Sequence, residues 1–317
     1  MKAIALISGG LDSFLAAKII QNQNIEVSGV YFLMPFCKQD ESGLNNPALK
    51  RTAEQLNLKL KVKYLGREYL KIVKNPKYGY GKNLNPCIDC KILMLKQARK
   101  IMKTSGAEFI VTGEVLGQRP MSQNRQSLNL IEKQSGLKGR LLRPLSAKMF
   151  EPTVAETKGW INREKLLDIK GRGRSEQIEL AKQFRITEYL QPAGGCLLTD
   201  SSFCDRLKDL LEHKEYSLDN IELLKLGRHF RISPAFKLIV GRDEKENEKL
   251  LKLAKKKDII FEPAELPGPT ALGIGVMDKK TKELSARIVA RYTAPNKKIK
   301  VLIKGLLEEE VIAKGKK

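Results

Sequence analysis

Two groups of residues in this chain have types and spacings that could carry chemistry. The first is the contiguous segment Ser8-Gly-Gly-Leu-Asp-Ser13, which follows the apolar run 3–7 and leads into a helical pattern. A Gly-Gly turn that enters a helix exposes backbone N–H groups, and the helix dipole adds positive potential. Ser8 and Ser13 can donate hydroxyl hydrogen bonds, and Asp12 can hold Mg²⁺ against phosphates. An ordinary polar turn is the alternative, but the six residues together predict a phosphate-binding loop.

The second group is formed by three of the five cysteines. Cys87 and Cys90 have Cys-x-x-Cys spacing and lead directly into an expected helix, whose dipole should depress their thiol pKa values. Cys196 follows two glycines, which let backbone come close to a bulky group. Cys37 and Cys204 fit ordinary buried cysteines. An odd number of cysteines argues against a disulfide framework.

Three interpretations fit Cys87, Cys90 and Cys196. Soft thiolates select iron–sulfur chemistry, so the three could hold a [4Fe-4S] cluster with one open iron that binds a sulfide. Cys87 and Cys196 could instead work as a pair through a persulfide, without metal. Structural zinc is the third interpretation, but it usually needs a fourth ligand. Cys204 is the candidate for that ligand, because neither histidine of the chain has metal-ligand spacing to the cysteines.

Strands and helices are expected to alternate along the first part of the chain. Apolar or β-rich runs predict strands, and helical periodicity predicts the segments between them. The expected strands are 3–7, 27–33, 61–64 and 109–112, and the expected helices are 13–20, 48–56 and 91–103. This alternation predicts a doubly wound parallel sheet, which binds ligands beyond the carboxyl ends of its strands.

The remaining sequence predicts a loop over the site, a connection and a smaller domain. Residues 117–139 are rich in Gln, Asn, Ser and Arg and are expected to form a mobile loop. Further expected helices are 160–167, 175–184, 203–211 and 244–256, and further expected strands are 236–240, 286–292 and 298–303. We therefore expect an ATP-binding domain over 1–165, a connecting segment with the third cysteine over 166–200, and an α+β domain over 201–317.

The charge of the chain predicts a polyanionic partner. Lys and Arg number 59 against 36 Asp and Glu, which gives a net charge of +23. Nucleic acid is the simplest partner for such a balance. Adaptation to heat also raises Lys, but it predicts matching Glu. No apolar run is long enough for a membrane span. We therefore expect a cytoplasmic protein with no membrane partner.

The loop and the cysteines together resemble a known family. Ser8–Ser13 resembles the pyrophosphatase loop (PP-loop) of the family that includes GMP synthetase, asparagine synthetase and the tRNA thiolation enzymes. The segments around the cysteines resemble tRNA 2-thiouridylases and 4-thiouridine synthetases. The segments are Asn85-Pro-Cys-Ile-Asp-Cys90, Thr112-Gly-Glu-Val-Leu-Gly-Gln-Arg-Pro-Met-Ser122 and Gly194-Gly-Cys-Leu-Leu-Thr-Asp200. Beyond residue 200, Gly241-Arg-Asp243, Glu246-Asn247 and Pro267-Gly268 resemble, more faintly, the RNA-binding domain of ribosome quality-control factors.

This resemblance implies an adenine nucleotide alpha hydrolase-like fold and an adenylation reaction. A uridine carbonyl oxygen attacks the α-phosphate of ATP, pyrophosphate leaves, and sulfur then displaces AMP. Asp12, Cys87 and Cys196 would be catalytic, and Cys87, Cys90 and Cys196 would hold the cluster, with zinc as the alternative. The residues implied to contact ATP or Mg²⁺ are Ser8, Gly9, Gly10, Leu11, Asp12, Ser13, Tyr31, Phe32, Gly113 and Glu114. The implied partners are tRNA, a sulfide or persulfide donor, and a second copy of the chain.

Several positively charged residues have a less specific sequence signal. Arginines in Gly171-Arg-Gly-Arg-Ser175, as well as Arg119 and Arg143, could grip nucleotide or RNA phosphates, or could simply be solvated. Lys91 could assist the cluster or a phosphate, although a lone lysine on a helix is more often solvated. Two other functions are also compatible with the loop. They are a small-molecule ligase, such as a queuosine-precursor nitrile synthase with zinc, and an RNA-binding regulator without catalysis.

Overall fold

The computed structural model describes residues 1–37, 47–189, 196–305 and 308–315. The chain divides into two compact units, Met1–Ser201 and Ser202–Lys317, and each is described by itself. The first unit holds the candidate site residues except Cys204. The functional division of this unit at residue 165 stays a prediction.

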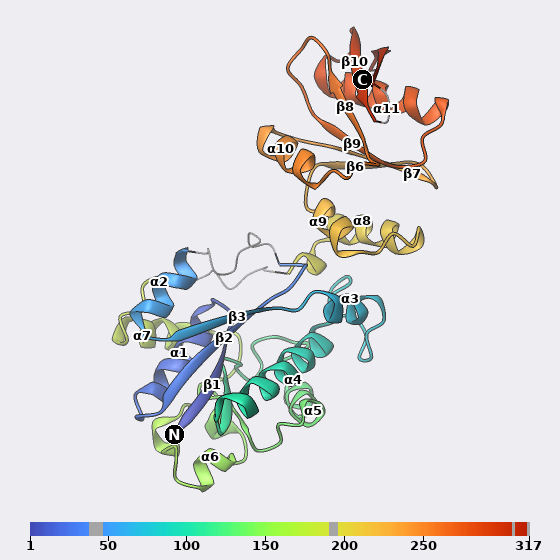
Figure 1. Cartoon of the computed structure of the whole chain (residues 1–317). Helices are drawn as coiled ribbons and strands as arrows, with labels where there is room; N and C mark the ends of the chain where they lie inside the picture. The colour runs from blue at the N-terminus through green and yellow to red at the C-terminus, as the bar shows by residue number, and fades with distance from the viewer. Residues whose placement is uncertain (38–46, 190–195, 306–307, 316–317) are drawn as a thin grey trace. The chain divides into compact units, whose positions relative to one another are not determined.

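The described part of the first unit contains a parallel sheet with the strand order β3-β2-β1-β4-β5. Apolar runs form its central strands, and β1 lies between β2 and β4. Figure 1 shows β1 and β2 side by side. The strands are β1 (Lys2–Ile7), β2 (Glu26–Leu33), β3 (Lys59–Tyr64), β4 (Phe109–Thr112) and β5 (Leu141–Leu142). This sheet confirms the expected α/β fold. Because all the strands are parallel, their carboxyl ends meet at one edge, where ligands of such sheets bind.

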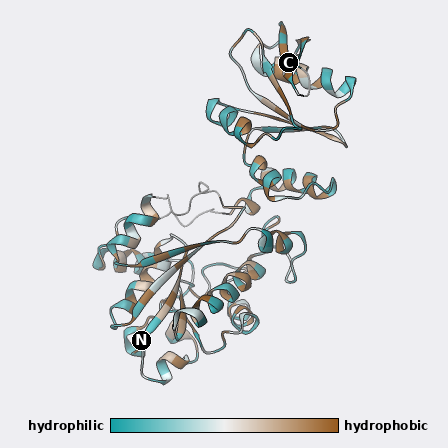
Figure 2. Cartoon of the chain, in the orientation of Figure 1, coloured by the Kyte–Doolittle hydropathy of each residue, from teal (hydrophilic) through white to brown (hydrophobic). Residues whose placement is uncertain are grey.

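Helices pack on both faces of this sheet. One apolar cluster joins Ala5 and Tyr31 to Phe14, and the other joins Ile4 and Val30 to Leu95. Apolar colour therefore follows the central strands in Figure 2, whereas the helices are polar on part of their surface. The helices are α1 (Leu11–Gln21), α2 (Pro47–Gln55), α3 (Arg67–Lys74), α4 (Cys87–Ser105), α5 (Arg125–Ser135), α6 (Val154–Thr157) and α7 (Ser175–Gln183). In the described ranges of the chain, no helix is long and apolar enough to cross a membrane.

Two expectations for the first unit were wrong. About half of the expected loop 117–139 is occupied by α5. Asn124 caps its first turn, since the Asn124 side chain accepts a 2.8 Å hydrogen bond from the Ser127 N–H. Leu128 and Ile131 are three residues apart, so they share a buried face that the polar composition concealed. The expected helix 160–167 contains only a short 3₁₀ turn, Arg163–Lys165.

The described part of the second unit contains an antiparallel sheet with the order β11-β10-β8-β9-β7-β6. Its strands are β6 (Arg228–Ser233), β7 (Phe236–Val240), β8 (Ile259–Pro263), β9 (Ala271–Gly275), β10 (Lys298–Lys304) and β11 (Glu308–Lys314). The helices in this part of the sequence are α8 (Ser201–Glu212), α9 (Leu218–Leu224), α10 (Glu244–Leu253) and α11 (Lys279–Thr293). The expected α+β architecture is therefore confirmed.

The expected strand 286–292 was wrong, because these residues lie in α11. Asp278 caps this helix through a capping box with Thr281. Ala286, Val289 and Ala290 are buried at helical spacing and pack in the core of the second unit. An apolar segment this short fits both the strand period of two residues and the helix period of about 3.6 residues. The capping box at Asp278, upstream of the segment, indicates a helix.

Candidate active site

The phosphate loop, Ser8–Ser13, is a tight turn between the carboxyl end of β1 and the first turn of α1. Gly9 has a φ of 81°, a left-handed conformation that glycine adopts without strain. The Ser13 Oγ donates a 2.7 Å hydrogen bond to the Gly10 carbonyl and accepts one of 3.2 Å from the Ser8 N–H. These contacts fix the loop at the positive end of α1, as the sequence predicted for an anion site.

Gly113, just after β4, lies against the backbone of this loop. A Cβ atom at Gly113 would come within 2.4 Å of the Asp12 carbonyl oxygen and 2.5 Å of the Ser13 nitrogen. Such distances leave no room for any side chain. Gly113 therefore allows the end of β4 to support the loop directly.

Two side chains from distant segments hold Asp12. The Gln118 Nε2 donates a 3.1 Å hydrogen bond to one carboxylate oxygen, and an Arg174 Nη2 lies 3.5 Å from the other. Among the described residues, no hydrogen-bond acceptor faces the buried Nε of Arg174. The sequence analysis did not predict Gln118. The only sequence signal for this residue is its position directly after Gly117. Arg174 belongs to the basic segment that it did single out.

The segments that carry Gln118 and Arg174 are joined by backbone contacts. Leu116 and Lys170 form a parallel bridge, and the Gly171 N–H donates a 2.7 Å hydrogen bond to the Leu116 carbonyl. This pairing brings the two segments to the same side of the loop. The basic segment around Arg174 therefore lies beside the Ser8–Ser13 loop.

Glu114 is buried in a charged network next to Gly113. Its carboxylate lies 3.2 Å from the Arg143 Nε and 3.4 Å from the Lys91 Nζ, and Thr112 donates a third contact of 3.2 Å. Burial acts to raise the pKa of Glu114, but Lys91 and Arg143 outweigh it and hold this pKa below its ordinary value. Of the two interpretations of Lys91, the merely solvated one is therefore excluded. This lysine links the first turn of α4 to the strand end beside the phosphate loop.

The expected adenine contacts stay predictions. Tyr31 and Phe32 are both buried at the end of β2, in the two different apolar clusters on opposite faces of the sheet. Side chains of consecutive strand residues point to opposite faces, so one adenine ring can meet only one of them face on. Glu114 already engages two cations, as described above.

Four cysteines, Cys37, Cys87, Cys90 and Cys196, form what we call the cysteine cluster. Cys87 and Cys90 open α4, and the Cys87 thiol donates a 3.2 Å hydrogen bond to Asn85. The Cys90 Sγ lies 3.7 Å from the Met34 sulfur, and the side chain of Cys90 is also hydrogen-bonded to Tyr69. Each cysteine of this group lies near enough to others for their charges to interact. The structure therefore brings together the three predicted cysteines.

Cys37 is the member of the cysteine cluster that the sequence analysis missed. It forms an isolated antiparallel bridge with Cys196, and the Leu197 N–H donates a 2.8 Å hydrogen bond to the Phe36 carbonyl beside this bridge. The interpretation of Cys37 as an ordinary buried cysteine was wrong, because its side chain is only partly buried and belongs to this group. Cys204 is buried in α8 of the second unit.

The thiol pKa values of Cys87, Cys90 and Cys196 are raised, whereas the sequence predicted depressed values for Cys87 and Cys90. Burial raises the pKa of Cys90 to about 12 and also raises those of Cys87 and Cys196. Nearby Arg119 and Lys91 lower the pKa of Cys87, but less than burial raises it. Desolvation of a thiolate thus outweighs the helix dipole here. The thiols are protonated near neutral pH and would lose their protons on binding a metal.

The donor set of the cysteine cluster fits an iron–sulfur cluster in its chemistry. Its members are all sulfur ligands, and soft thiolates are the ligands that such clusters take. Within the described residues, no three His, Cys, Asp or Glu side chains converge on a point that could hold a single metal ion.

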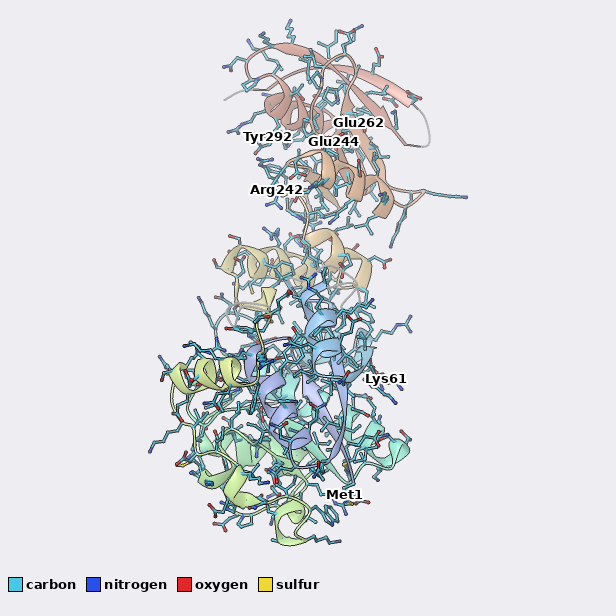
Figure 3. All side chains as sticks on the ribbon, turned by 90° about the vertical axis from the view of Figure 1, so that its left-hand side faces the viewer. Met1, Lys61, Arg242, Glu244, Glu262 and Tyr292 are labelled. Atoms are coloured by element: carbon cyan, nitrogen blue, oxygen red, sulfur yellow. The ribbon has the colours of Figure 1, made fainter. Side chains whose placement is uncertain are left out.

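The second unit carries an exposed pair of an arginine and an aromatic ring. The guanidinium of Arg228 lies 4.7 Å from the centre of the Tyr292 ring, and Tyr292 is 38% exposed. Figure 3 labels Tyr292 together with Arg242, Glu244 and Glu262 of this unit. Arg242 pairs with Glu246, which also accepts from the Gly227 N–H. An exposed ring beside arginine is a feature of surfaces on which nucleic-acid bases stack.

The parallel sheet and the Ser8–Ser13 loop together give the first unit the architecture expected of a PP-loop domain. Residues 1–154 match the family model described as thiamine biosynthesis protein (ThiI), and residues 227–313 match the model described as NFACT protein RNA binding domain. The first unit is therefore similar to proteins of the PP-loop tRNA thiolation family.

Curated relatives match the first unit over part of their length. A probable tRNA sulfurtransferase of Thermococcus kodakarensis is 31% identical over 152 residues, which are 45% of this chain and 36% of the relative. A tRNA-specific 2-thiouridylase of Campylobacter concisus is 32% identical over 117 residues, 36% of this chain and 34% of the relative. The chain thus spans about a third of the length of each relative.

Among solved structures, a 4-thiouridine synthetase–RNA complex with bound ATP is similar, with a TM-score of 0.41 and 18% identity. The similarity covers 71% of this chain and 52% of the other.

Proposed function

We propose that this chain is a tRNA sulfurtransferase that adenylates a uridine carbonyl with ATP and then replaces its oxygen with sulfur. One observation carries the proposal. The phosphate loop and the cysteine cluster occupy one edge of the same sheet, connected through Gly113, Glu114 and Lys91. An ATP site would account for adenylation of a substrate, but it would not identify the product of the reaction. Thiols at the same edge narrow the chemistry to sulfur transfer.

The phosphate loop would bind the β- and γ-phosphates through its backbone N–H groups, as other glycine-rich turns at helix starts do. Asp12 would hold Mg²⁺, and the ion would neutralise charge on the departing pyrophosphate. This role requires Asp12 to leave Arg174, whose guanidinium is then placed to bind a phosphate oxygen. Adenylation makes the uridine oxygen a good leaving group, because it departs with AMP.

The cysteine cluster would supply the sulfur chemistry. Cys87, Cys90 and Cys196 would hold a [4Fe-4S] cluster, which offers an iron with an open position for sulfide. Tyr69 hydrogen-bonds to Cys90 and thereby fixes the thiol that is most deeply placed. A cysteine persulfide on Cys196 is the metal-free alternative. The cluster route would require a sulfide donor. The persulfide route would require a donor that is itself a persulfide, which transfers its outer sulfur to Cys196 and leaves as a thiol.

tRNA is the proposed substrate, and the second unit is proposed to bind it. The net charge of +23 favours an RNA partner, and so does the exposed pair of Arg228 and Tyr292. The match of residues 227–313 to an RNA-binding family model supports this assignment. We place the protein in the cytoplasm, where its relatives' substrate is made. A homodimer stays a prediction.

The test is anaerobic reconstitution of the full chain with iron and sulfide, followed by incubation with ATP, Mg²⁺ and unmodified tRNA. Nucleoside mass spectrometry should detect one thiouridine, and AMP and pyrophosphate should form in equal amounts only when tRNA is present. Asp12→Ala should reduce AMP formation by at least about 100-fold, because charge stabilisation at the phosphates is lost. AMP formation that ignores tRNA but responds to a small carboxylic acid would instead identify a small-molecule ligase.

A further inference from the structure

Cys37 and Cys196 have a backbone relationship that no other pair of the cysteine cluster shares in the described residues. They are partners in an antiparallel bridge between a segment after β2 and a segment before α8. The hydrogen bond beside the bridge runs from the Leu197 N–H to the Phe36 carbonyl. A flanking hydrogen bond of this kind marks a non-hydrogen-bonded pair, in which opposed side chains approach most closely.

Such a pair fits the geometry of a disulfide. Opposed residues of a non-hydrogen-bonded pair have Cα atoms about 4.5 Å apart, and disulfides join Cα atoms about 4.4–6.8 Å apart. A bond between the two sulfurs therefore needs rotation of side chains and little movement of backbone. Both side chains are partly exposed, so a small reagent can reach them.

The other two thiols of the group have different partners. Cys87 donates to Asn85, whereas Cys90 contacts Met34 and Tyr69. The two thiols of the Cys-x-x-Cys segment thus point to separate groups. Closing a Cys87–Cys90 bond would break both sets of contacts.

We propose that Cys37 and Cys196 form a reversible disulfide that withdraws Cys196 from the sulfur site. The oxidant is a low-molecular-weight disulfide such as glutathione disulfide. The thiolate of one cysteine attacks this disulfide and releases one small thiolate. The other cysteine then attacks the mixed disulfide, the Cys37–Cys196 bond forms, and a second small thiolate leaves. The two cysteine protons pass to the two released thiolates, so two cysteines are oxidised and one small disulfide is reduced.

The consequence of this disulfide rests on the proposed function. A Cys196 that is bonded to Cys37 can neither ligate an iron nor carry a persulfide. Oxidation would therefore stop sulfur transfer and leave the phosphate loop intact, since that loop contains no cysteine. Reduction by an excess of thiol would restore the site.

The experiment equilibrates the metal-free full chain with mixtures of glutathione and glutathione disulfide. Remaining thiols are then alkylated, and peptides are mapped by mass spectrometry without reduction. We expect the Cys37–Cys196 peptide to exceed every other cysteine pair by about tenfold, which corresponds to about 30 mV for a two-electron couple. Cys204→Ala is the matched control and should give the same pair, whereas Cys37→Ser should lose it.

A predominant Cys87–Cys90 or Cys87–Cys196 peptide in the wild-type chain would overturn the proposal, and so would full alkylation of Cys37 at every ratio. A folded Cys37→Ser variant, checked by circular dichroism, ensures that loss of the pair reports the thiol. The mapping uses neither tRNA nor ATP. Its failure would therefore leave the proposed thiolation standing, and a failure of thiolation would leave the disulfide standing.

Discussion

The phosphate loop and the cysteine cluster lie at the same edge of one sheet but are assembled differently. The loop is six contiguous residues, and its internal hydrogen bonds join residues at most five positions apart. The cysteine cluster takes its members from three segments that are far apart in the sequence. They contain Cys37, the pair Cys87 and Cys90, and Cys196. A contiguous site can be read in sequence, whereas a site built from distant segments depends on the fold that gathers them.

The two regions also differ in the charge of their functional groups. In the loop, the Asp12 carboxylate forms an ion pair with Arg174 and accepts a hydrogen bond from Gln118. The cysteine thiols are instead desolvated, and burial raises the pKa of Cys90 to about 12. The charge in the loop is thus balanced by a counter-charge, whereas burial favours the neutral form of the cysteine thiols.

The largest expected effect is a loss of thiouridine formation without a loss of AMP formation, which would separate the roles of the two regions. Cys196→Ala should abolish thiouridine formation, because the site loses a sulfur ligand, and should leave tRNA-dependent AMP formation in place. Nucleoside mass spectrometry and AMP release measure the two steps on the same sample. Cys204→Ala, in the second unit, should retain both activities. Wild-type thiolation in Cys196→Ala would show that the cysteine cluster is not the sulfur site.

The next effect tests the charged link between the regions. Glu114→Gln should lower the free energy of unfolding at pH 7 by about 3 kcal/mol, because Lys91 loses its buried partner while Arg143 keeps Glu132. The measurement is urea denaturation. The control is Glu108→Gln, which removes an exposed pair with Arg140 and should cost less than about 1 kcal/mol.

The pH dependence of this difference has a definite sign. The pKa of Glu114 is lowered in the folded chain, so its contribution to stability is present above its ordinary pKa of 4.5 and is lost as pH falls through the folded value. The difference between wild type and Glu114→Gln should therefore shrink between pH 5 and pH 3. An equal difference at all pH values would contradict the network described for Glu114.

A smaller effect tests the support of the phosphate loop by β4. Gly113→Ala should reduce the kcat/KM for ATP about 100-fold, since a Cβ atom would displace the Asp12 backbone. Steady-state AMP formation measures this change. Gly173→Ala is the control, because a Cβ atom there meets nothing within 4 Å. Comparable losses in both variants would mean that the close approach of Gly113 is not responsible.

The smallest effect concerns Arg174. Arg174→Ala should raise the KM for Mg²⁺-ATP about tenfold, because it removes a hydrogen bond to a charged group, and such a bond contributes about 1.5–3 kcal/mol. Arg172→Ala is the matched control from the same basic segment. If thiolation fell while the KM for Mg²⁺-ATP stayed constant, Arg174 would act on RNA instead of nucleotide.

Local signals predicted the parts of the fold that depend on local sequence. The central strands, α1, α4 and the phosphate loop were all expected. Buried parallel strands are continuous apolar runs, and helices are indicated by the spacing of their apolar residues and by glycines at their ends. α5 and α11 were missed. Each has a short buried stripe within polar residues, and in each the capping side chain, Asn124 or Asp278, was the signal that could have found it.

The sequence by itself determined the phosphate loop, the pairing of Cys87 with Cys90 in one helical turn, and the positive charge. These depend on neighbours along the chain and on composition alone. Only the tertiary structure decided that Cys37 faces Cys196, that Lys91 is held by Glu114, and that the cysteine pKa values are raised. The reason is physical: desolvation and the approach of charges depend on what surrounds a group in space, and residues far apart in sequence supply those surroundings.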